Sequence, residues 1–145
     1  MFEKYIRKLR ITPAWDIKLE FVEDPDRPKT GGLKIDCDDC KAVLLSNAVN
    51  PKQENLEEVI VHELMHIKMY PLDQETGSLI ANCFEEGPAA SGFVCQQFFT
   101  ALEQTVEEPA KCFLPEYGEN REFSYGRCSR GRSFNDLYEG LNSIR

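Results

Sequence analysis

Residues 62 to 66 of this chain read His-Glu-Leu-Met-His and contain both of its histidines. In a helix, positions i and i+4 lie on one face, so the rings of His62 and His66 can point at one metal ion. Glu63 stands beside them, where a carboxylate can polarise a water molecule on that ion. The run therefore predicts one Zn²⁺ per chain, with His62 and His66 as ligands and Glu63 as the catalytic base.

A catalytic zinc ion takes three protein ligands and keeps one position open for water. The third ligand cannot be a histidine, because the chain holds no other. The motif also does not continue as H-E-x-x-H-x-x-G-x-x-H, since Met69 and Leu72 occupy the last two of those positions. This excludes a metzincin-type site and leaves Glu, Asp or Cys as the third ligand.

The strongest candidate for that ligand lies in the segment 102–108, which reads Leu-Glu-Gln-Thr-Val-Glu-Glu. Glu103 and Glu107 are i and i+4 in an otherwise apolar helical pattern, where an unpaired carboxylate is costly. We predict that Glu103 completes the metal site and that Glu107 accepts the N–H of a ligand histidine. Glu85 and Glu86 are competing ligands, and a solvated helix face is the alternative for the pair on the helix.

The helix that carries the histidines has two predicted starts, at Asn50-Pro51 and at Asn55, because asparagine caps helices well. We expect it to stop near Tyr70, since Pro71 disfavours helical geometry in the residue before it. Its apolar residues recur at helical spacing and predict a stripe that faces the core.

The second helix is predicted from Phe93 to Glu108, where Pro109 ends or kinks it. Residues 71–92 contain five glycines and prolines and are interpreted as a long connection, with one helical turn at 79–83. Beyond residue 115 the chain becomes rich in glycine and arginine, and residues 134–141 have the pattern of one short helix.

Three short strands are predicted upstream, at residues 15–21, 33–37 and 41–46, after a short amphipathic helix at 2–9. The fold class is α+β, with a small antiparallel or mixed three-stranded sheet, an N-terminal helix, the H-E-x-x-H helix and the glutamate helix. We expect residues 1–114 to form the metal-binding domain and residues 115–145 to form a C-terminal extension.

The 145 residues carry a net charge of −8, which argues against nucleic acid or an anionic membrane as the main partner. The first ten residues lack the apolar stretch of a secretory signal, and no segment has the length of a membrane span. We therefore expect a cytoplasmic protein with reduced thiols at its six cysteines. Cys37 and Cys40 have the spacing of half a structural zinc site, but no second such pair accompanies them.

An H-E-x-x-H helix followed by a helix with Glu103 and Glu107 resembles the gluzincin peptidases. The small size resembles that of their minimal members, the minigluzincins. The resemblance covers about residues 2 to 112, from the first helix through a Trp-x-Ile strand to the glutamate helix. His62, Glu63 and His66 match the family motif directly, and Glu103 matches by pattern at 37 residues beyond His66.

The resemblance implies a zinc-dependent endopeptidase that acts on a peptide or protein. In such families a bound peptide runs antiparallel to an edge strand, and residues 41–46 or a neighbouring strand would take that place here. Relatives often stabilise the oxyanion with a tyrosine or histidine, so Tyr70, Tyr117 and Tyr125 are candidates.

The resemblance also implies latency, because terminal segments block the cleft in minimal family members. Residues 113–145 would act in this way, with the thiol of Cys128 in the open position of the metal. The alternative function is a metal-bearing regulatory or binding module with little or no turnover.

Overall fold

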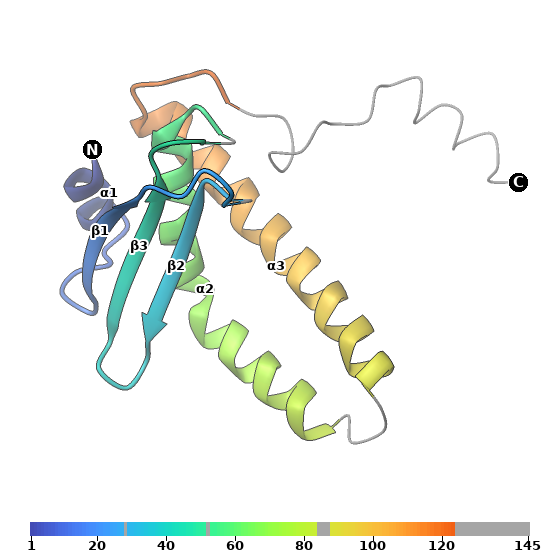
Figure 1. Ribbon diagram of the computed structural model, residues 1–145. Coiled ribbons are helices and arrows are strands. Elements are labelled where there is room, and N and C mark those ends of the chain that lie inside the picture. Colours follow the sequence, from blue (N-terminus) through green and yellow to red (C-terminus); the bar gives the residue numbers. More distant parts are fainter. Residues whose placement is uncertain (28, 52, 84–87, 124–145) are drawn as a thin grey trace, which may run out of the picture.

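The computed structural model describes residues 1–27, 29–51, 53–83 and 88–123. Along the chain the elements are α1 (Phe2–Lys8), β1 (Asp16–Val22), β2 (Gly31–Asp36), β3 (Lys41–Asn47), α2 (Leu56–Cys83) and α3 (Pro88–Tyr117). The predicted α+β fold class is confirmed. Helix α2 packs against the sheet, α1 and α3, and so occupies the centre of the fold (Figure 1).

The sheet is mixed and has the strand order β1-β3-β2. Strand β1 pairs parallel with β3, which places Leu19 opposite Leu44. Strand β2 pairs antiparallel with β3, which places Leu33 opposite Leu44, and a tight turn joins the two strands. Strand β3 is therefore central, whereas β2 is an edge strand that pairs only with β3 within the described residues.

Helix α2 begins at Leu56, which corresponds to the second of its two predicted starts. The side-chain oxygen of Asn55 accepts a hydrogen bond of 3.2 Å from the backbone N–H of Glu58 and caps the helix. The alternative start at Asn50-Pro51 is wrong, because the segment between β3 and α2 is irregular. Instead, the side chain of Asn47, the last residue of β3, accepts hydrogen bonds from the backbone N–H groups of Val49 and Asn50.

The predicted end of α2 at Tyr70 is wrong, because the helix continues through Pro71 to Cys83. Proline removes one backbone hydrogen bond and crowds the preceding turn, which commonly kinks a helix. Helix α2 changes direction part-way along its length (Figure 1). The turns beyond Pro71 still bury apolar surface, since Ile80 is only 7% exposed.

The predicted connection 71–92 and the predicted end of the second helix at Glu108 are also wrong. Helix α3 begins at Pro88 and passes through Pro109 and Pro115 to Tyr117. Its buried residues recur every four positions on both sides of Pro109, so packing favours a continuous helix over a break. These buried residues are Leu102, Val106, Ala110 and Leu114.

The core lies where α1, β3, α2 and α3 meet. Its largest fully buried apolar side chains are Tyr5, Ile11, Leu44, Ile60, Leu64 and Leu114. In the described part of the chain, no helix has the length and apolar content needed to cross a membrane. The predicted helix 134–141 and most of the predicted extension 115–145 lie outside the described residues.

One carboxylate ties the two ends of the described chain to the core. Glu57, in the first turn of α2, is 1% exposed. It accepts a short hydrogen bond from the hydroxyl of Tyr5 in α1 and lies 3.6 Å from the amine of Lys4. It also accepts hydrogen bonds of 2.8 and 2.9 Å from the backbone N–H groups of Glu119 and Asn120, just beyond α3. Burial raises the pKa of Glu57, but these partners outweigh burial and lower it below its usual value.

We expect Glu57→Ala to lower the free energy of unfolding by about 3 kcal/mol, because it leaves a buried hydroxyl and two N–H groups without their acceptor. Urea denaturation followed by circular dichroism measures this change. Glu54→Ala, at an exposed position just before α2, is the matched control and should change stability by less than about 0.5 kcal/mol. Equal losses in the two variants would contradict the structural role of Glu57.

Candidate metal centre

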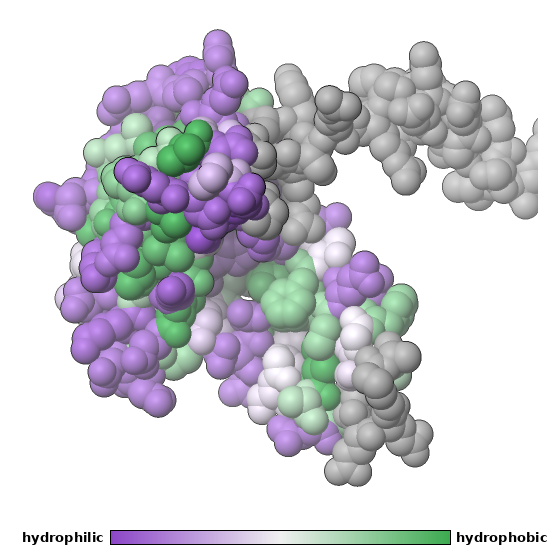
Figure 2. All heavy atoms as spheres, in the orientation of Figure 1, coloured by the Kyte–Doolittle hydropathy of each residue, from purple (hydrophilic) through white to green (hydrophobic). Residues whose placement is uncertain are grey.

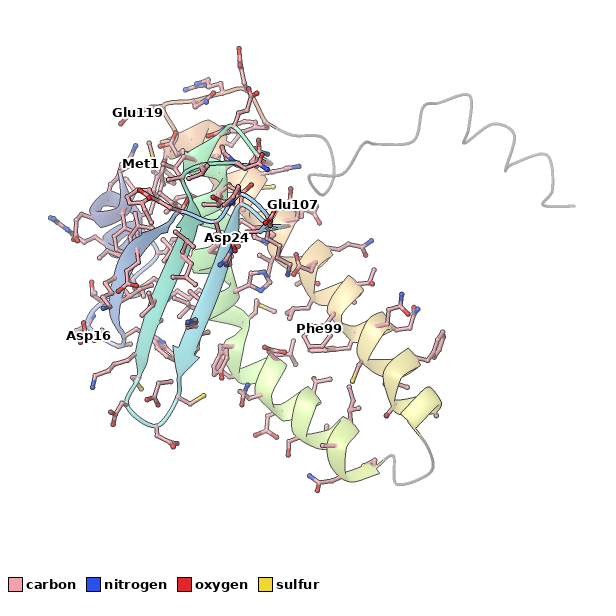
Figure 3. The ribbon with its side chains drawn as sticks, viewed as in Figure 1. Met1, Asp16, Asp24, Phe99, Glu107 and Glu119 are labelled. Carbon is pink, nitrogen blue, oxygen red and sulfur yellow. The ribbon has the colours of Figure 1, made fainter. Side chains whose placement is uncertain are left out.

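The structure brings all five predicted site residues together in the space between α2, α3 and β2. His62, Glu63 and His66 project from α2, whereas Glu103 and Glu107 project from α3. In Figure 3, Glu107 lies near the start of β2, close to the point where α3 crosses α2. The histidines flank the buried Leu64 on the same helix, so the packing that buries this leucine also fixes the direction of the two rings.

The three candidate ligands lie at distances that suit a single ion. The Nε2 atoms of His62 and His66 are 3.2 Å apart. The carboxylate oxygens of Glu103 lie 3.4 Å from Nε2 of His62 and 3.7 Å from Nε2 of His66. Atoms bound at ~2.1 Å with tetrahedral angles are ~3.4 Å apart, so these side chains fit three corners of a tetrahedral zinc site. Two imidazoles and a carboxylate also suit other divalent transition metals.

Glu107 fixes the orientation of His62. One of its carboxylate oxygens lies 2.7 Å from Nδ1 of His62, which leaves Nε2 of that ring facing Glu103 and His66. Its other oxygen lies 2.7 Å from the amine of Lys111, one turn further along α3. The same amine lies 3.7 Å from Glu58 in α2. Lys111 was not among the residues predicted from the sequence, although its i+4 spacing from Glu107 was a usable signal.

These contacts decide the charge of the cluster. Burial lowers the pKa of His62, but hydrogen bonds to Glu103 and Glu107 outweigh burial and raise it to about 9. Burial raises the pKa of Glu107, but hydrogen bonds to His62 and Lys111 outweigh burial and lower it. Without a metal ion, the carboxylates of Glu103 and Glu107 therefore favour the protonated, positively charged form of His62. A divalent cation would replace that proton and satisfy the same carboxylates.

Glu63 lies against strand β2 at a position where only glycine fits. A Cβ atom on Gly31 would overlap the Oε1 atom of Glu63 and come within 2.8 Å of Cγ1 of Val59. Burial raises the pKa of Glu63 to about 6, although the nearby charges of Lys29 and Arg27 act to lower it. Gly31 lies two residues before the strand predicted at 33–37, and no role was predicted for it from the sequence. A glycine at a strand position, where a close approach is common, was the available signal.

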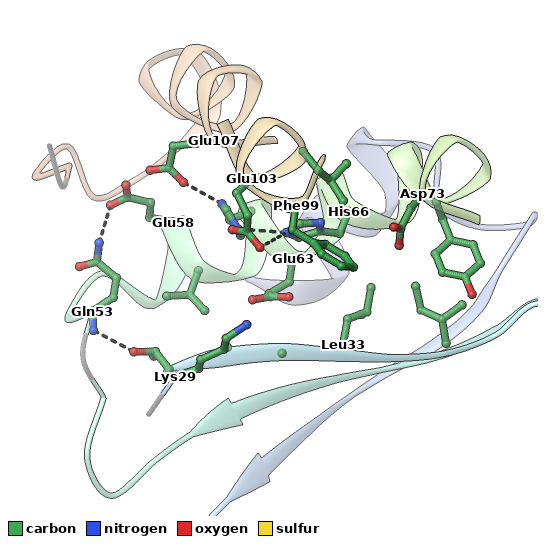
Figure 4. A pocket seen from close by; sticks show the side chains of 18 residues that line it. Lys29, Leu33, Gln53, Glu58, Glu63, His66, Asp73, Phe99, Glu103 and Glu107 are labelled. Atoms are coloured by element: carbon green, nitrogen blue, oxygen red, sulfur yellow. Dashed lines mark hydrogen bonds and ion pairs between the residues drawn. The ribbon is translucent and has the colours of Figure 1, made fainter. Parts of the chain in front are cut away.

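The site opens into a pocket of about 940 Å³. Its walls are the edge strand β2, the face of α2 that carries the two histidines, and α3 from Phe99 to Glu107 (Figure 4). The surface in Figure 2 is hollowed between the sheet and the lower halves of α2 and α3, with hydrophobic and hydrophilic surface around the hollow. The candidate ligands and Glu63 therefore line a pocket that is large enough for a small molecule or a peptide side chain.

Of the remaining candidates, one lies in the pocket, one lies outside it, and four are not described. Tyr70 lines the pocket, and its hydroxyl accepts a hydrogen bond of 2.9 Å from the thiol of Cys37. Tyr117 ends α3, where its ring packs against Phe113, and it is not among the pocket residues. Four further candidates, Glu85, Glu86, Tyr125 and Cys128, lie outside the described residues.

The described cysteines are free thiols. Cys37 and Cys40 are exposed and flank the turn between β2 and β3. Within the described ranges, the only group of side chains close enough to hold a metal is that of His62, His66 and Glu103.

No protein-family model, no curated protein and no solved structure matches this chain.

We expect purified, reconstituted protein to bind about one Zn²⁺ per chain, and His62→Ala or Glu103→Ala to abolish tight binding, because each removes one of three ligands. Glu107→Ala should weaken binding by about 10- to 100-fold through loss of the hydrogen bond to His62. Competition with a chromophoric chelator measures these affinities. Glu108→Ala, at the exposed neighbouring position, is the matched control. Unchanged affinity in Glu103→Ala would exclude Glu103 as the third ligand.

Proposed function

We propose that this protein is a zinc-dependent endopeptidase of the gluzincin type, with His62, His66 and Glu103 as metal ligands. One observation carries the proposal: among the described residues, three ligand groups, rather than four, line an open pocket together with the carboxylate of Glu63. Structural zinc sites are closed by four protein ligands, whereas catalytic sites use three and leave one position for water.

The residues of the site have distinct roles in hydrolysis. When bound, Zn²⁺ lowers the pKa of a coordinated water to roughly 7 and polarises the carbonyl of the substrate. Glu63 accepts a proton from the attacking water and then donates it to the leaving amine. Burial raises the pKa of its carboxyl above the usual value for glutamate, which favours its action as a proton acceptor. Glu107 holds His62 in the required tautomer, and Lys111 keeps Glu107 ionised.

Strand β2 supports a polypeptide as the substrate. It is an edge strand, and residues Gly31 to Leu33 form one wall of the pocket. An extended peptide can pair with the free edge of such a strand through backbone hydrogen bonds. The resemblance implied this role for residues 41–46 or a neighbouring strand. Strand β3 is central, and of its two neighbours only β2 contributes residues to the pocket, so we assign this role to β2.

Glu63→Ala tests catalysis directly. With Zn²⁺ bound, we expect the full chain to cleave an unfolded protein or a peptide mixture, and Glu63→Ala to lower the rate by about 10²- to 10⁴-fold, because the proton acceptor is lost. Mass spectrometry of the products measures cleavage, and metal analysis should find Zn²⁺ retained in the variant. Glu75→Ala, exposed on the same helix, is the control. Zinc binding without cleavage by the unmodified chain would favour the alternative, a metal-bearing regulatory or binding module.

Gly31→Ala tests the position of the same carboxylate without removing it. The added methyl group would collide with Glu63 and Val59, so Glu63 must move from its place against β2. A displacement of about 1 Å can cost about 100-fold in rate, and we expect a loss of that order in kcat with Zn²⁺ affinity unchanged. Gly77→Ala is the matched control, because a Cβ there meets nothing within 4 Å. Wild-type kcat in Gly31→Ala would contradict this role.

A further inference from the structure

The end of the pocket beyond His66 contains a carboxylate that none of the proposed chemistry uses. Asp73 projects from α2 into this end, and Lys29 lies at the opposite end (Figure 4). Asp73 is half-buried, and within the described ranges it makes no hydrogen bond or ion pair. Burial raises the pKa of its carboxyl, as expected for an acid short of partners. A ligand cation would supply the missing partner.

The walls around Asp73 are apolar. Leu33 and Ile35 are alternate residues of β2, so they face the pocket on the same side of the strand. Phe99 contributes from α3 with 53% of its surface exposed. Tyr70 completes this end, and its ring is held edge-on against Trp15 at a centroid distance of 5.9 Å. A long apolar stem with a cation at its tip matches such a site, and lysine and arginine have this form.

We propose that this end of the pocket is a subsite for a lysine or arginine side chain of the substrate, with Asp73 as the specificity-determining residue. The inference rests on the proposed peptidase function. The apolar stem of the substrate side chain packs between Ile35 and Tyr70, and its charged tip pairs with Asp73. Hydrogen bonds between ionised groups are among the strong ones, so a short ion pair in this half-buried place discriminates well against a neutral side chain.

The charge at the two ends of the pocket makes this preference specific to one position of the peptide. Lys29 lines the other end, and Arg27 is near enough to act on the pKa of Glu63. The acids Glu58 and Glu107 also line that end, but both lie close to the amine of Lys111, so a basic side chain is attracted more strongly at Asp73. The net charge of −8 also draws cationic peptides towards the protein as a whole.

The distance along α2 limits which substrate residue reaches the subsite. Asp73 follows His66 by seven residues, so it lies two helical turns, ~10 Å, from the candidate metal ligands. An extended peptide covers ~10 Å in about three residues. The lysine or arginine of the substrate therefore lies within about three residues of the bond that is cut. It belongs to the part of the peptide that runs past Ile35.

Cleavage of a positional peptide library by the zinc-loaded full chain tests the preference. We expect lysine and arginine to be enriched at one position near the cut. For the best arginine peptide, Asp73→Asn should lower kcat/KM by about 10- to 100-fold, because one charged partner is lost. The same peptide with norleucine in place of arginine should be cut equally well by both forms. Asp73→Lys should shift the preference to glutamate, and Glu75→Gln, exposed on the same helix, is the control.

A binding experiment separates this inference from the proposed function. Zinc-loaded Glu63→Ala should bind the arginine peptide about tenfold or more tighter than the norleucine peptide, and Asp73→Asn in that background should remove the difference. If the unmodified chain cuts no peptide but this difference is found, the peptidase function fails and the subsite stands. If peptides are cut or bound without an Asp73-dependent preference for a basic residue, the subsite is overturned.

Discussion

The packing of α3 against α2 is the interaction on which the candidate site depends. Leu102 and Val106 are buried in the stripe that holds α3 in place, and Glu103 and Glu107 directly follow them in the sequence. Each step along a helix turns the side chain by about 100°, so burial of the stripe directs both carboxylates towards one flank. On that flank they meet His62. A rotation of α3 by one residue would leave the apolar stripe exposed and would break the metal site as well.

Most of the buried or half-buried acids around this contact have partners within the protein. Glu57 is bound by Tyr5 and by backbone N–H groups, and Glu107 is held between His62 and Lys111. Desolvated carboxylates need such partners, because burial alone disfavours their charged form. Within the described ranges, Asp73 and Glu63 are the exceptions in the pocket, because burial raises the pKa of both and neither makes a hydrogen bond or an ion pair. Glu103 faces imidazole nitrogens that a metal ion can bridge. A bound cation therefore fits where the protein leaves negative charge incompletely neutralised.

Helix α2 connects the metal centre to the proposed subsite. His62, His66, Tyr70 and Asp73 follow one another at intervals of three or four residues, so a single helix face presents them all to the pocket. This arrangement requires the helix to continue through Pro71. Strand β2 closes the pocket opposite that face, and Gly31 lets the helix approach closely enough for Glu63 to touch the strand.

The sequence by itself determined the features that repeat locally. Alternation of apolar and polar residues predicted the strand at 15–21, and helical spacing predicted that His62 pairs with His66 and Glu103 with Glu107. The tertiary structure decided what depends on distant partners: the order β1-β3-β2, the choice of Asn55 as the cap, and the passage of both helices through their prolines. A proline weakens a helix by a local cost, but the benefit that offsets it comes from apolar residues buried against another element. Gly31 and Asp73 acquire their roles in the same way, because the side chains that they contact or face belong largely to other segments of the chain. Lys111 is joined to Glu107 by local helical spacing, but only the tertiary structure brings it near Glu58.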